Sequence, residues 1–257
     1  MRGTGANTTD VRLGMVVSLN GFPTTFTTAI PVSPATPVLL AWSGGKDSSL
    51  ALARLREDPS VRVCALVTAV TSGYDRISIH GVRRELLERQ AAAIGLPLIV
   101  APLEVNAPNA AYEEAWARAL AEGTARFDGA MHVAYGDLFL EEVRAYREAQ
   151  LRALGYTPVY PIWGENTAAL ARRFIADGFR AVLTCVDTTQ LDAKFAGRDF
   201  TGELLDELPE SVDPCGERGE FHTYVWAGPH MREPVAIVGG EHVLRDNRFE
   251  YCDFLPA

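Results

Sequence analysis

The segment Ser43–Ser48 (SGGKDS) brings two glycines, two hydroxyls, a lysine and a carboxylate together within six residues. It follows the short apolar run Val38–Trp42, and helical apolar spacing begins at Lys46. A glycine turn between a strand and a helix gathers backbone N–H groups at the positive end of the helix dipole. Glycine suits such a turn because a Cβ would hinder the close approach of an anion. The segment is therefore a candidate phosphate site.

Two common nucleotide motifs do not fit this turn. A Walker loop has four residues between its first glycine and its Gly-Lys pair, and the dinucleotide turn has the spacing G-x-G-x-x-G. The plain structural alternative is a serine-capped helix after a glycine turn. The buried strand that precedes the turn favours the phosphate site.

A second cluster, Gly216–Thr223 (GERGEFHT), holds two glycines, two carboxylates and a histidine. Strand alternation after Gly219 predicts Glu220 and His222 on one face of a strand. Phe221 and Thr223 would lie on the other face. A carboxylate beside an imidazole suits acid–base work, the orientation of an amine or metal binding. From these residues alone, a polar hairpin with an incidental histidine remains open.

Polar residues also follow the predicted fourth strand. Gly136 and Asp137 stand at its carboxyl end, where we favour a functional role such as holding Mg²⁺. Glu141, Arg144 and Arg147 then share one helix face. That face suits a substrate with carboxylate or phosphate groups, or it is an exposed ladder of ion pairs. A lone histidine before the second helix, His80, is more often a cap or surface residue than a catalyst.

Strand and helix patterns alternate from Pro37 onward, which predicts right-handed βαβ units and a parallel sheet. The predicted strands are Val38–Trp42, Arg62–Thr68, Leu98–Ala101, Met131–Tyr135 and Ala181–Val186, with Tyr156–Trp163 returning toward the sheet. The predicted helices are the one from Lys46, then Val82–Ile94, Asn109–Arg126, Glu141–Leu154 and Thr167–Asp177. Ligands of such sheets bind at the carboxyl ends of the strands.

The sequence suggests three parts. Residues 1–36, rich in Thr, Gly and Pro, are expected to be a poorly ordered extension. Residues 37–155 are expected to form an α/β domain that carries the candidate phosphate site, and residues 156–257 a smaller α+β domain that carries the second cluster. The alternation stops after Thr188, and Val235–Phe254 predicts two strands around a turn near Asp246 and Asn247.

Composition limits the function classes. The chain has 257 residues and a net charge of −9, which argues against general binding to nucleic acid or anionic membranes. Its four scattered cysteines include no C-x-x-C pair, which is typical of reduced thiols in a cytoplasmic protein. No apolar run approaches the roughly 20 residues that span a bilayer.

The first cluster resembles the SGGxDS signature of the N-type ATP pyrophosphatases, the PP-loop family. The matching residues are Ser43, Gly44, Gly45, Asp47 and Ser48. The resemblance implies that this loop holds the β- and γ-phosphates of ATP. Ser43 and Ser48 would donate hydrogen bonds, Lys46 would add charge, and Asp47 would orient the loop or bind Mg²⁺. It also implies adenine binding at the carboxyl end of the second strand, at Val67 and Thr68.

The two clusters together resemble the branch that contains diphthine–ammonia ligase, from about Val38 to about Gly228. This resemblance implies a Rossmann-like domain of the adenine nucleotide α-hydrolase type. It places the second substrate at the GERGEFHT segment and implies a role for Arg198 in the loop before it. The expected catalytic residues are Glu217, Glu220 and His222. The expected substrate contacts are Gly136, Asp137, Glu141, Arg198 and Thr223.

One segment departs from the family. The eukaryotic and archaeal ligases have a pattern G-A-I-x-S-x-Y-Q-R after the fourth strand, whereas residues 136–142 read GDLFLEE. This difference leaves the acceptor open, as a small molecule or a protein.

The sequence thus predicts a ligase that adenylates an acceptor carboxylate, releases pyrophosphate, and then releases AMP when ammonia or an amine attacks. ATP and Mg²⁺ are the expected cofactors, and a homodimer is open because dimers are common in this fold class. Two rivals remain. One is a tRNA-modifying PP-loop enzyme, which the acidic charge disfavours. The other is a nucleotide-sensing module without turnover.

Overall fold

The computed structural model describes residues 35–77 and 80–257. Most of the predicted N-terminal extension, residues 1–34, lies outside the described part of the chain. All described residues belong to one compact unit. The division near Gly155 into an ATP-binding and a substrate domain stays a prediction.

The first sheet has five parallel strands in the order β3-β2-β1-β4-β5. Its strands are β1 (Thr36–Ala41), β2 (Val61–Thr71), β3 (Leu98–Leu103), β4 (His132–Ala134) and β5 (Thr157–Val159). The chain reverses its direction of travel across the sheet between β1 and β4. Such a switch point opens a crevice at the carboxyl ends of the two strands, where ligands of this architecture bind.

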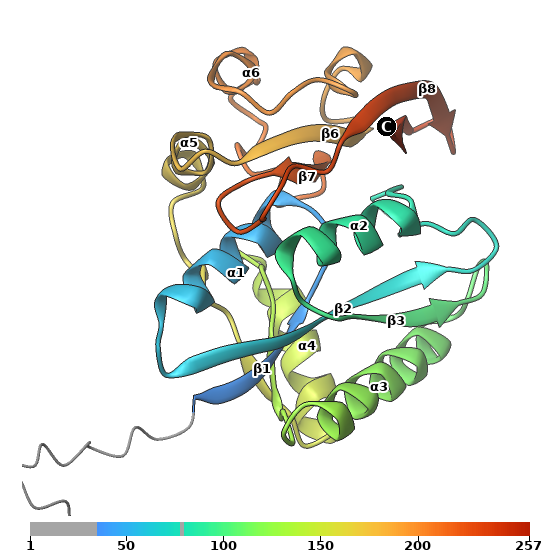
Figure 1. The fold of residues 1–257 in the computed structure, drawn as a ribbon. Helices are drawn as coiled ribbons and strands as arrows, with labels where there is room; N and C mark the ends of the chain where they lie inside the picture. Colours follow the sequence, from blue (N-terminus) through green and yellow to red (C-terminus); the bar gives the residue numbers. More distant parts are fainter. Residues whose placement is uncertain (1–34, 78–79) are drawn as a thin grey trace, which may run out of the picture. The chain divides into compact units, whose positions relative to one another are not determined.

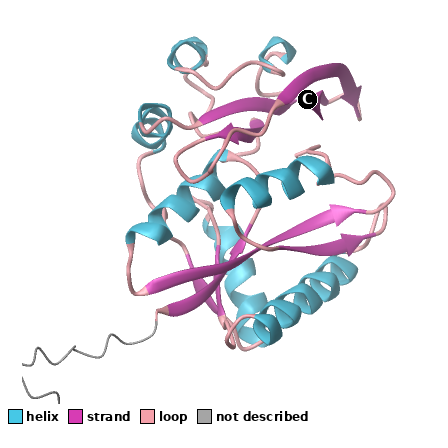
Figure 2. Cartoon of the chain, in the orientation of Figure 1, coloured by secondary structure: helices cyan, strands magenta, loops and turns pink. Residues whose placement is uncertain are grey.

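Helices cover both faces of this sheet (Figures 1 and 2). They are α1 (Lys46–Glu57), α2 (Arg84–Ile94), α3 (Asn109–Arg126) and α4 (Glu141–Ala153). Leu40 of β1 packs in the core with α1 and α2, whereas its neighbour Leu39 packs on the opposite face with α3. Burial on both faces explains why β1 reads as an uninterrupted apolar run.

The second sheet is antiparallel, in the order β7-β6-β9-β8, and lies on the far side of α1 and α2 (Figure 1). Its strands are β6 (Arg180–Asp187), β7 (Phe221–Ala227), β8 (Ile237–Arg245) and β9 (Phe249–Pro256). Three helices accompany it, α5 (Thr167–Ala176), α6 (Gly202–Glu207) and the short 3₁₀ helix η1 (Ala193–Phe195). The predicted α/β fold with a second α+β part is confirmed.

Two details of the second sheet bear on the sequence predictions. Asp246 and Asn247 adopt positive φ angles of 54° and 50° between β8 and β9, which confirms the predicted turn. The strand predicted at Ala181–Val186 forms, but it pairs antiparallel in the second sheet and does not extend the parallel one. Among the described residues, no helix is long and apolar enough to cross a membrane.

Candidate active site

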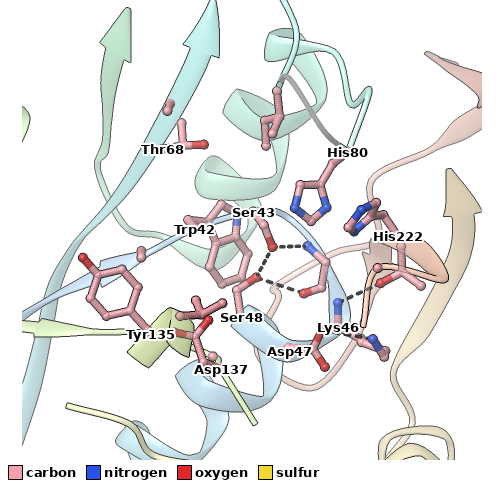
Figure 3. Close-up of a pocket in the computed structure, with 18 of the residues that line it drawn as sticks. Trp42, Ser43, Lys46, Asp47, Ser48, Thr68, His80, Tyr135, Asp137 and His222 are labelled. Carbon is pink, nitrogen blue, oxygen red and sulfur yellow. Dashed lines mark hydrogen bonds and ion pairs between the residues drawn. The ribbon is translucent and has the colours of Figure 1, made fainter. Parts of the chain in front are cut away.

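A cavity of about 470 Å³ opens at the switch point, between the carboxyl ends of the parallel strands and the segment Gly216–Thr223 (Figure 3). Its lining includes most of the residues that the sequence predicts for the site: Ser43, Gly45, Lys46, Asp47, Ser48, Val67, Thr68, Gly136, Asp137, Glu217, His222 and Thr223. The two sequence clusters, more than 160 residues apart, therefore meet at one cavity.

The loop at one end of the cavity has the geometry of an anion cradle. Gly44 has φ +77°, which side chains rarely adopt, and a Cβ there would meet the Leu87 side chain at 2.8 Å. The N-cap of α1 is Gly45, which has no side chain to cap the first N–H groups. The serine-capped helix that the sequence left open does not form. Ser43 and Ser48 lie beside the turn with their hydroxyl oxygens 3.3 Å apart.

The second sheet holds this loop in place. Thr223 Oγ1 accepts a hydrogen bond from the Lys46 backbone N–H at 3.1 Å, and Val225 N–H donates to the Gly44 carbonyl at 2.9 Å. The buried Gln90 amide donates to the carbonyls of both Gly44 and Val225, at 2.9 and 2.7 Å. The candidate phosphate loop, Ser43–Ser48, and β7 therefore form one hydrogen-bonded unit.

The side chain of Lys46 is buried within this unit, with only 2% of its surface exposed. Its Nζ lies 3.0 Å from Asp47 Oδ2 and donates to the Cys215 carbonyl, with the Phe221 ring centroid 5.3 Å away. Burial opposes the charge, but Asp47 and the other nearby acidic groups outweigh it, and the pKa of Lys46 is raised. The ammonium group thus links the phosphate loop to the segment before Gly216.

The residues near the loop fit a hard cation. Asp47 Oδ1 is buried and has no hydrogen-bond partner among the described residues, so this oxygen is available to a ligand. Mg²⁺ takes carboxylate oxygens and commonly binds through one or two of them plus substrate phosphates. Within the described ranges, no group of three or more His, Cys, Asp or Glu side chains forms a complete metal cage.

The two carboxylates of the second cluster differ in their surroundings. Glu217 lines the cavity, and its Oε1 accepts hydrogen bonds from the backbone N–H groups of Leu138 and Phe139, at 2.8 and 3.4 Å. Burial raises the pKa of Glu217 to about 7, against the opposing effect of the Leu138 N–H. Glu217 therefore titrates near neutral pH, as a general base requires.

Glu220 has a different place from the one expected of a catalytic group. It is 1% exposed and does not line the cavity. Its two oxygens accept hydrogen bonds from the backbone N–H groups of Asp213 and Arg218, at 2.8 and 2.9 Å. The Glu220 carboxylate therefore holds together the loop that carries Glu217, so its role is structural.

The imidazole rings of His222 and His80 lie next to each other in the lining of the cavity, with their ring centroids 4.4 Å apart (Figure 3). Burial, together with the charge of Lys46, lowers the pKa of His80 to about 4 and that of His222 well below its ordinary value. Both imidazoles are therefore neutral at pH 7. His80 Nδ1 is buried without a hydrogen-bond partner in the described part of the chain, which leaves it available to a ligand.

The opposite end of the cavity is aromatic. Trp116 donates from Nε1 to the Tyr135 hydroxyl at 3.2 Å, and the Tyr112 ring stacks on Trp116 with centroids 6.1 Å apart. The Arg147 guanidinium lies 4.3 Å from the Tyr135 ring centroid, and its Nε is 2.8 Å from Asp137 Oδ2. Flat apolar walls with a few fixed polar groups suit a purine or another planar ligand.

Sequence reasoning missed part of this end. Tyr112 and Trp116 are spaced by four within α3, a pattern that ordinarily indicates core packing. Arg147 was left open as a member of an ion-pair ladder, and the structure pairs it with Asp137. No local signal separates these residues from ordinary packing residues.

Three further predicted residues remain to be placed. Gly136 lines the cavity where a Cβ would lie 2.8 Å from the Asp47 carbonyl oxygen, so only glycine fits. Glu141 and Arg198 do not line it. Glu141 is exposed in the first turn of α4, and Arg198 forms two hydrogen bonds of 2.7 Å with Glu207.

Comparison with known protein families gives two matches. The model of the diphthamide synthase N-terminal domain matches residues 36–158, and the model of the diphthamide synthase C-terminal domain matches residues 166–253. No curated protein matches the chain. The two matched ranges are separated by residues 159–165, which run from the end of β5 toward α5, and together they include both walls of the cavity.

Proposed function

The chain belongs to the diphthamide synthase family, and on that premise we propose that it is an ATP-dependent ligase that joins a carboxylate to ammonia or an amine. The observation that carries the proposal is the meeting of the phosphate loop and the Gly216–Thr223 segment at one cavity. Thr223 bonds the first N–H of α1, and Glu217 bonds the loop that follows β4. In the proposed function, a nucleotide at the loop and an acceptor at the Gly216–Thr223 segment would meet at the same point.

In the proposed arrangement the cavity binds ATP along its length. The uncapped start of α1, with Ser43 and Ser48, receives the β- and γ-phosphates. The aromatic end, with Val67 and Thr68 at the end of β2, receives the adenine. Asp47 would hold Mg²⁺, which neutralises charge on the pyrophosphate leaving group when it is bound. The buried Lys46 keeps the loop and its carboxylate in position.

The reaction we propose has two steps. An oxygen of the acceptor carboxylate attacks the α-phosphorus, the bond from that phosphorus to the α–β bridging oxygen breaks, and pyrophosphate leaves. The nitrogen nucleophile then attacks the acyl carbon, AMP leaves with the electron pair of the acyl–oxygen bond, and Glu217 accepts the proton from nitrogen. Glu217 suits this role because its pKa of about 7 leaves it ionised at a slightly alkaline pH.

The neutral histidines suit positioning better than proton transfer. Because the pKa of His80 is about 4, its imidazole is a poor acceptor for the proton of an amine near pH 7. His222 and His80 instead present hydrogen-bonding nitrogens to the acceptor without adding charge. Residues 136–142, which differ from the pattern of the eukaryotic and archaeal ligases, lie beside Glu217. We therefore propose that this segment determines which acceptor is bound.

Product analysis with ATP labelled at the α-phosphate tests the proposal. The protein is incubated with Mg²⁺, ammonium and either fractionated cell metabolites or a protein extract. We expect labelled AMP with one class of acceptor, together with pyrophosphate, and none without it. ADP and phosphate as the products would refute the proposal. Tight ATP binding without any turnover would instead support the nucleotide-sensing interpretation.

A further inference from the structure

A second cavity, of about 320 Å³, lies next to the 470 Å³ cavity of the candidate active site, which is called the active cavity from here on. Ile77 lines both cavities. Its walls come from the end of β2, the turn that leads to α2, and strands β8 and β9. The lining residues that carry charge or an aromatic ring are Tyr74, Arg76, Arg83, Glu241, Arg245, Tyr251 and Asp253. Neither the fold nor the proposed reaction gives this cavity a role.

The cavity is basic in an acidic protein. Three arginines face two carboxylates there, whereas the whole chain carries a net charge of −9. Arg76 and Arg83 share one of the carboxylates: Asp253 lies 2.6 Å from Arg76 Nη1 and 2.5 Å from Arg83 Nη2. Asp253 thus fixes two guanidinium groups at the wall without neutralising both of them.

Arg245 is held differently. Its guanidinium lies over the rings of Tyr74 and Tyr251, 5.7 and 5.4 Å from their centroids. The guanidinium forms no hydrogen bond or ion pair with any residue in the described part of the chain, whereas the Arg245 backbone carbonyl accepts from the Arg248 N–H at 3.0 Å. A guanidinium that lies over aromatic rings keeps its N–H groups available to a ligand. Those N–H groups can bind a carboxylate or phosphate through two parallel hydrogen bonds.

We propose that this cavity is an anion-binding site that holds a carboxylate or phosphate group, with Arg245 as its principal contact and Arg76 and Arg83 as supporting charges. Among the described residues that line the cavity, Glu241 is the carboxylate that is not paired with an arginine. The site would receive the distal anionic group of the acceptor, because the turn that carries Arg76 and Arg83 also carries His80 into the active cavity. This assignment to the acceptor rests on the proposed function, whereas the anion site does not.

Isothermal titration calorimetry tests the site directly. Citrate and, separately, inorganic phosphate are titrated into the full chain saturated with α,β-methylene-ATP, which occupies the phosphate loop. We expect one anion per chain, bound at least tenfold more weakly by Arg245→Gln. The matched control is Arg118→Gln, which removes another exposed arginine, one of α3 that pairs with Glu114. It should bind as the unaltered protein does.

Each outcome decides the proposal. Saturable binding of citrate or of phosphate that depends on Arg245 supports it, and the stronger anion identifies the group. No binding, or equal weakening by Arg245→Gln and Arg118→Gln, overturns it. Failure of α,β-methylene-ATP to bind would count against the proposed function alone. The Arg245→Gln comparison would then be made without the analogue and would still decide the anion site.

Discussion

The two ends of the active cavity are built in different ways. The phosphate-loop end consists of one continuous segment, Ser43–Ser48, whose backbone is fixed by the turn itself and by hydrogen bonds to β7. The aromatic end consists of single side chains from α3, from the segment that follows β4 and from α4, held by contacts with one another. The first end depends on backbone geometry and the second on side-chain packing, so substitutions should affect them differently.

The largest difference should appear when the cation of each end is removed. Lys46→Met removes an ammonium group that is only 2% exposed and that donates to Asp47 and to the Cys215 carbonyl, and we expect a loss of about 3–5 kcal/mol in the free energy of unfolding. Arg147→Met should cost less, because 27% of the Arg147 side chain is exposed and its pair with Asp137 is therefore partly solvated. Urea unfolding of both variants measures the difference. Equal losses would show that the two ends are held alike.

A second substitution tests the close approach between β4 and α1. Gly136→Ala would place a Cβ 2.7–2.9 Å from the backbone of Asp47 and Ser48, and overpacking of this kind costs about 1–3 kcal/mol. We expect affinity for α,β-methylene-ATP to fall about tenfold or more, measured by calorimetry. Gly202→Ala is the control, because a Cβ there meets nothing within 4 Å. An unchanged affinity in Gly136→Ala would show that the strand end does not shape the nucleotide site.

Fragments of ATP sharpen the comparison. Trp116→Phe removes the hydrogen bond to the Tyr135 hydroxyl, worth about 1 kcal/mol, and should weaken adenosine binding about fivefold while pyrophosphate binding stays the same. Ser48→Ala should do the reverse. Calorimetric titration of each variant with each fragment gives four comparisons. If adenosine and pyrophosphate affinities fall together in either variant, the assignment of the two ends is wrong.

A further expected effect is a pH dependence of stability. The pKa of Glu217 is about 7 in the folded protein, above its ordinary value of 4.5, so the folded state binds more protons between these values. The contribution of Glu217 to stability is therefore greatest at acid pH and decreases as the pH rises from about 4.5 to 7. Glu217→Gln should flatten this part of the profile of melting temperature against pH. An identical slope in the variant would contradict the burial of this carboxylate.

The sequence was sufficient where function depends on local backbone. The strand before the loop, the helix from Lys46 and the turn at Asp246 and Asn247 all follow from short-range patterns, and the structure confirms them. The limits of α3 are the predicted ones, Asn109–Arg126. Each of these features depends on the spacing of apolar residues or on residues that favour a particular φ. Both are local properties of the sequence.

The sequence was insufficient where a role depends on distant contacts. Glu217 and Glu220 are three residues apart in one motif, yet only Glu217 lines the cavity, because Glu220 is needed to bond the backbone of its own loop. His80 gains its partner His222 only through the approach of β7 to the turn before α2. Arg198 was expected at the site by resemblance, and its pairing with Glu207 depends on the position of α6.

The most direct test of the central claim uses two analogues of ATP that differ in which phosphate bridge cannot be cleaved. With the acceptor fraction that supports AMP formation, we expect β,γ-methylene-ATP to be turned over to AMP and methylenediphosphonate, and α,β-methylene-ATP to bind without reaction. That result would place the cleaved bond between the α- and β-phosphates. Turnover of α,β-methylene-ATP, with β,γ-methylene-ATP inert, would contradict the claim that this cavity adenylates an acceptor.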